Sequence, residues 1–188
     1  EPGAIFSQNK EIGPYSEENG FKEGPTYVGA KVSTTIGGGV CKISSTLYNI
    51  AVLANLEIVE RHNHNMPVPY VPYGQDATVA YGAKDFRFKN NTDFPLLIWA
   101  KGIDNRLYMA FYGRESPPDV KWQHQFLNRQ KAPVIYKTNP NLSANVENIL
   151  LEGMDGVTVN SWVIITDKEG SAVRKFLGTS YYNPMPYL

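Results

Sequence analysis

Residue types that can carry covalent catalysis lie close together in this sequence. The chain has one cysteine, Cys41, which follows the glycines at 37–39 with one residue between and opens an apolar stretch of helical period. Two of the three histidines, His62 and His64, follow about twenty residues later. A thiolate is a nucleophile, and an imidazole can accept the proton of a thiol and later return it. The pattern therefore raises the hypothesis of a cysteine nucleophile served by a histidine base.

The glycine triplet predicts a helix that begins at about Cys41, because glycine inside a helix is unfavourable. The unpaired amide groups of a first helical turn carry partial positive charge, which favours a thiolate over a thiol. The backbone amides of Gly38, Gly39 and Lys42 could also stabilise an oxyanion, since glycine lets a substrate approach closely. We therefore expect the pKa of Cys41 to lie below the free-thiol value of about 8.5.

The histidines belong to the segment LEIVERHNH (56–64), which is predicted to be a strand. In a strand, His62 and His64 would point to the same face. A tight turn near 55–56 would return this strand towards the start of the helix, so the spacing is compatible with a Cys–His dyad. Either histidine could be the base, and we favour His64.

Other side chains could support such a site. Arg61 adjoins His62 and is a candidate for support. Ser44 and Ser45 could flank the face of the helix that carries the cysteine, although serines in helices are usually solvated. Asp76, in the segment GQDATVAY, could orient a histidine as the third member of a catalytic group, although an aspartate after glycine is more often a turn residue.

Two other interpretations of these residues stay open. A lone cysteine at a helix start is often a small hydrophobic residue that is simply packed. Cys41, His62 and His64 together could also hold zinc with one open coordination position, although no fourth ligand is clearly placed. We expect neither a metal nor a cofactor.

Composition narrows the class of partner. The 188 residues contain 18 basic and 18 acidic side chains, so no net charge attracts nucleic acid or an acidic membrane. One cysteine excludes an internal disulfide. The longest apolar stretch is interrupted by Asn55 and Glu57, and the chain begins with Glu1, which favours a fragment. We expect contact with a membrane only through a segment outside this chain.

The hydrophobic pattern predicts an α+β fold with one main helix. Apolar residues recur at helical spacing over residues 41–55. Strand-like segments separated by turns predict an antiparallel meander over residues 77–113, on which this helix would pack. The segment RESPPD (114–119) is a candidate linker, and alternating residues beyond it predict a small β-rich unit.

The ordered motifs from the glycine triplet to DATVAY closely resemble the VanW domain family. That family has a glycine triplet, a hydrophobic residue and a cysteine, then TLYN, ERH-x-H and G-x-DATV-x-Y. The likeness covers roughly residues 2–113. Residues 145–188 resemble, more loosely, the small glycine-rich β module that often follows such domains. The resemblance implies a catalytic domain over residues 1–116 and a β-rich C-terminal module over residues 117–188.

The resemblance also implies an activity and a location. Some VanW-domain proteins are L,D-transpeptidases, which implies Cys41 as the nucleophile and matches His62 and His64 to the family's histidines. Lys42 and Asn65 depart from the family's usual glutamine and serine. The expected partners are peptidoglycan stem peptides, as acyl donor and acceptor, outside the cytoplasm in the envelope of a Gram-positive-type bacterium. The alternatives are a cysteine peptidase or amidase (a carboxypeptidase) on cell-wall peptides, and a non-catalytic wall-binding module.

Overall fold

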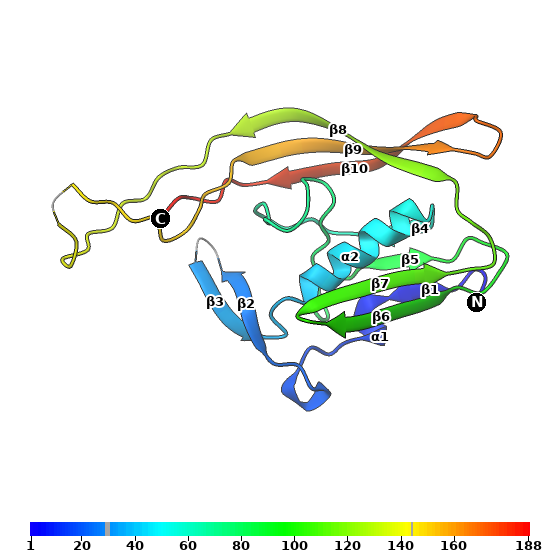
Figure 1. Cartoon of the computed structure of the whole chain (residues 1–188), viewed down its shortest axis with the longest axis horizontal. Coiled ribbons are helices and arrows are strands. Elements are labelled where there is room, and N and C mark those ends of the chain that lie inside the picture. The colour runs from blue at the N-terminus through cyan, green and yellow to red at the C-terminus, as the bar shows by residue number, and fades with distance from the viewer. Residues whose placement is uncertain (29–30, 144) are drawn as a thin grey trace.

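The computed structural model describes residues 1–28, 31–143 and 145–188. Figure 1 shows one long helix among several small sheets. In chain order the elements are β1 (Ile5–Ser7), α1 (Gln8–Glu11), a 3₁₀ turn (Glu17–Asn19), β2 (Glu23–Val28), β3 (Lys31–Ile36), α2 (Val40–Leu53), β4 (Glu57–Glu60), β5 (Arg87–Lys89), β6 (Leu97–Ile103), β7 (Arg106–Tyr112), β8 (Asp119–Gln130), β9 (Gly156–Thr166) and β10 (Ala172–Tyr182).

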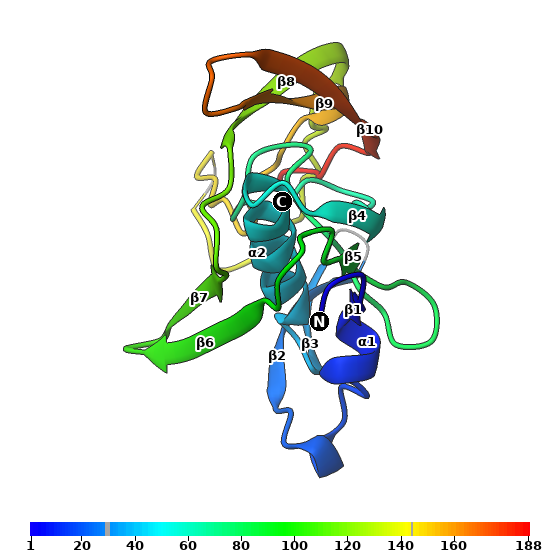
Figure 2. The ribbon, with the colours of Figure 1, turned by 90° about the vertical axis from the view of Figure 1, so that its right-hand side faces the viewer.

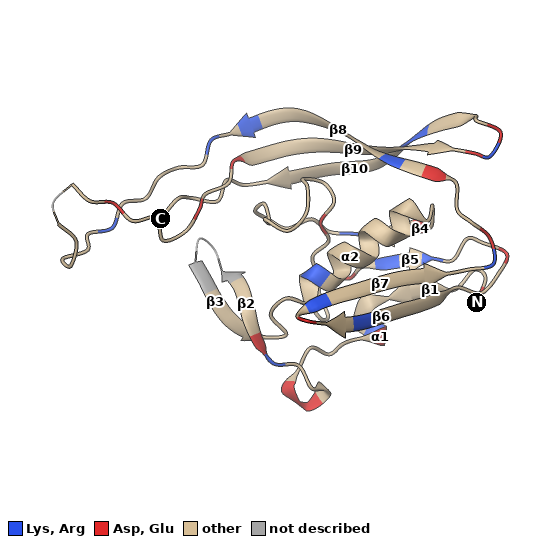
Figure 3. Ribbon diagram, viewed as in Figure 1, with Lys and Arg blue, Asp and Glu red and all other residues tan. Residues whose placement is uncertain are grey.

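The predicted α+β class is wrong, because the chain is mostly β. Strands take up 40% of the chain and helices 12%. In the described residues the strands form separate sheets with the orders β1-β5-β4, β10-β9-β8, β2-β3 and β6-β7. Basic and acidic residues are spread along the chain over these elements instead of gathering on one of them (Figure 3).

The predicted meander over residues 77–113 does not form as one sheet, although its last two strands pair as the expected antiparallel hairpin. Strand β5 pairs with β1 and β4, whereas β6 and β7 pair with each other in a sheet of their own. Residues 77–81 form no strand, and Ala80 makes one isolated bridge to Lys84. Their alternation of apolar and polar residues has another cause: Ala77 and Val79 are buried in the core cluster that includes α2.

Helix α2 begins where the glycines predict. Gly39 is its N-cap with φ of +94°, a conformation that favours glycine, and Cys41 is its second residue. The helix ends at Leu53, and Asn55, at φ of +55°, reverses the chain into β4. The buried face consists of Ser44, Ser45, Leu47, Tyr48, Ala51 and Val52.

The strand predicted over residues 56–64 is shorter than expected. β4 ends at Glu60, and residues 61–64 have no regular structure. The prediction that both imidazoles point to one face of a strand is therefore wrong. The cause lies in the side chains and amides of this segment, because Arg61 and the amide of His64 bind Asp76.

The C-terminal sheet shares a core with the helix. Figures 1 and 2 both show the sheet of β8, β9 and β10 lying over one side of α2. Tyr48 of α2 meets Trp122 of β8 edge to face, with ring centroids 5.7 Å apart, and meets Phe86 at 5.8 Å. Val120 and Val163 from this sheet join the same cluster. The division into domains over residues 1–116 and 117–188 stays a prediction.

Two glycines bring the hairpin of β2 and β3 against the start of α2. Gly24 and Gly38 face each other so closely that a Cβ atom on either would collide with the backbone of the other. The amide of Gly37 donates a hydrogen bond to the carbonyl of Lys22 at 3.1 Å. This backbone contact fixes where the helix can begin.

We expect Gly38→Ala to lower the free energy of unfolding by about 3 kcal/mol, since the new methyl group would force apart two backbones that cannot yield. Gly102→Ala is the control, because a Cβ there meets nothing within 4 Å. Its unfolding free energy should change by less than about 0.5 kcal/mol. Denaturant unfolding measures both variants, and equal stabilities would contradict this account of the helix start.

Candidate active site

Cys41 lies at the N-terminal end of α2, beside a pocket of about 380 Å³. Its Sγ atom lies 3.4 Å from Oγ1 of Thr78 and 3.7 Å from the carbonyl oxygen of Val79. The pocket is also lined by Lys42, His64 and Tyr70. The cysteine is therefore partly buried but borders a space that a ligand can enter.

His64 links this cysteine to a buried carboxylate. Its side chain and the Cys41 thiol each shift the pKa of the other, and its Nδ1 atom lies 2.6 Å from Oδ2 of Asp76. The Nε2 atom lies 3.3 Å from the hydroxyl of Tyr70. Cys41, His64 and Asp76 therefore form a chain of nucleophile, base and orienting acid, the arrangement on which nucleophilic catalysis by serine and cysteine enzymes rests.

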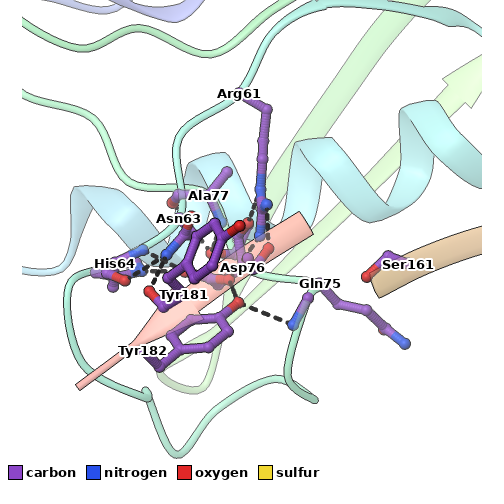
Figure 4. A network of polar contacts seen from close by, with 12 residues as sticks. Arg61, Asn63, His64, Gln75, Asp76, Ala77, Ser161, Tyr181 and Tyr182 are labelled. Atoms are coloured by element: carbon purple, nitrogen blue, oxygen red, sulfur yellow. Dashed lines mark hydrogen bonds and ion pairs between the residues drawn. The ribbon is translucent and has the colours of Figure 1, made fainter. Parts of the chain in front are cut away.

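Asp76 is 1% exposed and receives donors on both carboxylate oxygens. Oδ2 accepts hydrogen bonds from the amide of His64 at 2.7 Å and from its ring, and Oδ1 accepts from Arg61 at 2.8 Å and from the hydroxyl of Tyr182. Figure 4 shows these side chains converging on the carboxylate. So many donors keep Asp76 ionised and fix its orientation.

The electrostatics favour a thiolate paired with an imidazolium. Burial alone raises the pKa of Cys41, but interactions with His64, Thr78 and Val79 outweigh it and lower the pKa. Burial alone lowers the pKa of His64, but Asp76 and Cys41 together raise it to about 9. Both shifts favour the state in which the Cys41 thiol is deprotonated while the His64 imidazole keeps its proton. The ion pair is lost at low pH, where Cys41 becomes a neutral thiol, and above about pH 9, where His64 becomes a neutral imidazole.

Arg61 balances the charge of Asp76 at Oδ1, the carboxylate oxygen that His64 does not contact. Its Nε atom also donates to the carbonyl of Asp76 at 2.7 Å, and its guanidinium lies over the ring of Tyr48 at 5.1 Å. Its side chain is 13% exposed, so the ion pair with Asp76 is shielded from solvent. Burial raises the pKa of Asp76, but the bond to His64 and the charge of Arg61 outweigh burial and lower it.

Ser44 and Ser45 fasten the segment that carries Asp76 to the helix. Ser44 donates to the carbonyl of Ala77 at 2.7 Å, and Ser45 accepts from the amide of Ala77 at 2.9 Å. Ser45 also donates to the carbonyl of Cys41 at 2.7 Å. Both serines are fully buried, so the expectation of solvated helix serines is wrong. They set the distance between Cys41 and the segment of Asp76.

His62 lies apart from this group. Its Nε2 atom is 3.0 Å from a carboxylate oxygen of Glu60, and its side chain is 40% exposed. Its carbonyl accepts from the amide of Thr78 at 2.8 Å, which is a backbone role. Across the described ranges, no three or more His, Cys, Asp or Glu side chains are grouped so that they could hold a metal ion, so the zinc set is not assembled.

Two of the amides expected to stabilise an oxyanion already donate hydrogen bonds within the protein. The amide of Gly38 donates to the carbonyl of Thr35, and that of Lys42 donates to the carbonyl of Gly39, each at 2.9 Å. The amides of Gly39 and Cys41 bind no acceptor among the residues that the structure describes. Gly39 and Cys41 also line the pocket. These two amides are therefore the better candidates for an oxyanion site.

Three residues near the site were not predicted from the sequence. Thr78, whose hydroxyl meets the cysteine, stands in DATVAY, where its alternation with apolar residues indicated only a strand. Tyr182 and Ser180 bind Asp76 and Arg61 from more than a hundred residues away along the chain. No local pattern could reveal those two, since nothing near them in the sequence marks a partner.

Comparison with known proteins assigns this arrangement to a family. Residues 1–112 match the family model described as VanW like protein. The chain belongs to the VanW family. The VanW match contains Cys41, His64 and Asp76, but it ends before β8, so Ser180 and Tyr182 lie outside it.

Two relatives illustrate the VanW family. The chain is 41% identical over 114 residues to the uncharacterized protein YoaR of Bacillus subtilis (strain 168), a match that covers 61% of this chain and 38% of the relative. It is 28% identical over 121 residues to the vancomycin B-type resistance protein VanW of Enterococcus faecalis (strain ATCC 700802 / V583), covering 62% and 44%. The matches thus span less than half of either relative, and no solved structure matches.

We expect His64→Gln and His62→Gln to differ sharply in thiol reactivity. At pH 6, His64→Gln should slow the alkylation of Cys41 by iodoacetamide about tenfold or more, because the thiolate loses its cationic partner. His62→Gln is the matched control and should stay within about twofold, since His62 contacts Glu60 instead. Equal rates in both variants would contradict the assignment of His64, and thermal unfolding checks that each variant is folded.

Proposed function

We propose that this VanW domain is a cysteine acyltransferase of the cell wall, an L,D-transpeptidase that cross-links peptidoglycan stem peptides. The observation that carries the proposal is the group Cys41, His64 and Asp76 at a helix N-terminus beside a pocket. One relative is named as a vancomycin resistance protein, and vancomycin acts on the bacterial cell wall. That connection supports a cell-wall substrate for the same chemistry.

The first half of the reaction forms a thioester. The Cys41 thiolate attacks the carbonyl carbon of the third residue of a stem tetrapeptide, and the oxygen becomes an oxyanion near the amides of Gly39 and Cys41. Each well-placed amide would stabilise this oxyanion by roughly 3 kcal/mol. The bond to the terminal D-alanine then breaks, and the His64 imidazolium gives its proton to the leaving amine.

The second half transfers the acyl group. The neutral His64 takes a proton from the side-chain amine of a second stem as that amine attacks the thioester. The Cys41 thiolate leaves, an amide joins the third residues of the two stems, and the imidazolium is restored. Asp76 stays ionised throughout, because it is held by Arg61 and by the amide of His64, and it stabilises the imidazolium in the resting enzyme.

The pocket offers a place for the acidic end of the donor. Lys42, next to the nucleophile, holds its ammonium 5.6 Å from the centre of the Tyr70 ring, and both residues line the pocket. No aspartate or glutamate is among the described residues that line it. The ammonium would attract the carboxylate of the terminal D-alanine and so place the preceding carbonyl near Cys41.

The proposed substrate sets the location. Stem peptides are cross-linked outside the cytoplasm, so we place the domain in the envelope of a Gram-positive-type bacterium, with membrane attachment through a segment outside this chain. In the described ranges, no helix has the length and apolar character needed to cross a bilayer. Donor and acceptor stems are the proposed partners.

Purified tetrapeptide muropeptides incubated with the wild type should release D-alanine and yield dimers joined between third-position residues. A covalent adduct on Cys41, with the mass of the donor minus D-alanine, should accumulate when acceptor is scarce. Cys41→Ala is the control and should form neither product nor adduct. Mass spectrometry measures all three species.

Other products would overturn the proposal in distinct ways. Tripeptide without dimers at high acceptor concentration would identify a carboxypeptidase. Cleavage between the terminal D-alanines of a pentapeptide would identify a D,D-specific enzyme. Neither adduct nor product with any of these stems would favour the non-catalytic wall-binding module.

A further inference from the structure

The last strand of the chain places two hydroxyl groups on the buried charges of the site. The hydroxyl of Tyr182 donates to Oδ1 of Asp76, and Oγ of Ser180 accepts from Arg61 at 2.7 Å. Tyr182 is 6% exposed and Ser180 is 1% exposed. Because they are two residues apart in β10, they lie on the same face of the strand. One strand therefore contacts both members of the ion pair.

Tyr182 is itself held as a hydrogen-bond donor to Asp76. The amide of Gly74 donates to its hydroxyl oxygen at 2.8 Å, which leaves the hydroxyl proton for the carboxylate. Its ring meets the ring of Tyr73 edge to face, with centroids 5.5 Å apart. Burial and the charge of Asp76 raise the pKa of Tyr182, so its proton stays in place. Figure 4 shows this hydroxyl beside Asp76.

The end of β10 also binds the segment that carries His64. The side chain of Asn63 donates to the carbonyl of Tyr181 at 2.8 Å, and the amide of Asn183 donates to the carbonyl of Asn65 at 2.8 Å. His64 lies between these two attachments in the sequence. The strand thus holds both the residue that carries the imidazole and the carboxylate that orients it.

We propose that β10 completes the active site, with Tyr182 as a positioning residue that keeps the Asp76 carboxylate turned towards His64. Oδ2 faces the amide and ring of His64, while Oδ1 is held on the other side by Arg61 and Tyr182. The region that matches the VanW family, residues 1–112, is then an incomplete catalytic unit without the C-terminal sheet. This inference rests on the proposed roles of Cys41, His64 and Asp76, and it is independent of the substrate.

Thiol reactivity tests the inference without any substrate. The pH dependence of Cys41 alkylation by iodoacetamide is measured for the wild type, Tyr182→Phe, and the double variant Ser180→Ala/Tyr182→Phe. In Tyr182→Phe the inflection should move up by about one pH unit, a tenfold loss of thiolate below it, since a less well-held Asp76 supports the imidazolium less. The double variant should shift further. Tyr181→Phe is the matched control, because Tyr181 is 66% exposed and lies on the opposite face of β10; its inflection should stay unchanged.

The outcomes separate this inference from the proposed function. A wild-type inflection at the free-thiol value of about 8.5 would remove the activated nucleophile, and with it both proposals. A depressed wild-type inflection that is the same in Tyr182→Phe would overturn the positioning role alone, even if that variant unfolds at a lower temperature. Should the double variant fail to fold, Ser180→Ala by itself replaces it, with a smaller upward shift expected.

Discussion

The structure around the site depends on one buried negative charge, the carboxylate of Asp76. A carboxylate that is 1% exposed is tolerable only when its charge is paired and its oxygens accept hydrogen bonds. Here the donors come from Arg61, from the amide and ring of His64, and from Tyr182 in the last strand. Segments far apart in the sequence must therefore meet at this point, and the imidazole is oriented as a consequence.

The same requirement explains why the centre of the molecule is irregular. Residues 61–64 leave the sheet because their backbone and side chains bind Asp76. The segment after Asp76 is bound by buried serines of α2 and not by a neighbouring strand. Small sheets surround this connection without joining into one. Cys41, at the start of α2, therefore lies against a segment that is held by side-chain hydrogen bonds and not by a neighbouring strand. A pocket lies beside it.

Much of the site was predictable from local sequence, but the residues of β10 that hold Asp76 and Arg61 in place were not. The glycine triplet marked the helix start, and the hypothesis of Asp76 behind His64 matches what the structure brings together. The alternation in ATVAY suggested a strand because burial against a helix and pairing in a sheet produce the same pattern, whereas the end of LEIVERHNH leaves the strand where Arg61 and His64 bind Asp76. Contacts between distant segments determine the pairing of β1 with β5 and the hydrogen bond from Tyr182 to Asp76. A local pattern of apolar and polar residues does not predict such contacts.

The most direct measurement is a titration of the His64 imidazole by NMR in the wild type and in Cys41→Ala. The account predicts a wild-type pKa of about 9, because Asp76 and the thiolate both stabilise the imidazolium. The pKa should fall in Cys41→Ala, where the thiolate is absent and Asp76 remains. A wild-type imidazole that titrates near the ordinary value of about 6.5, unchanged by loss of the thiol, would contradict the thiolate–imidazolium pair on which the account rests.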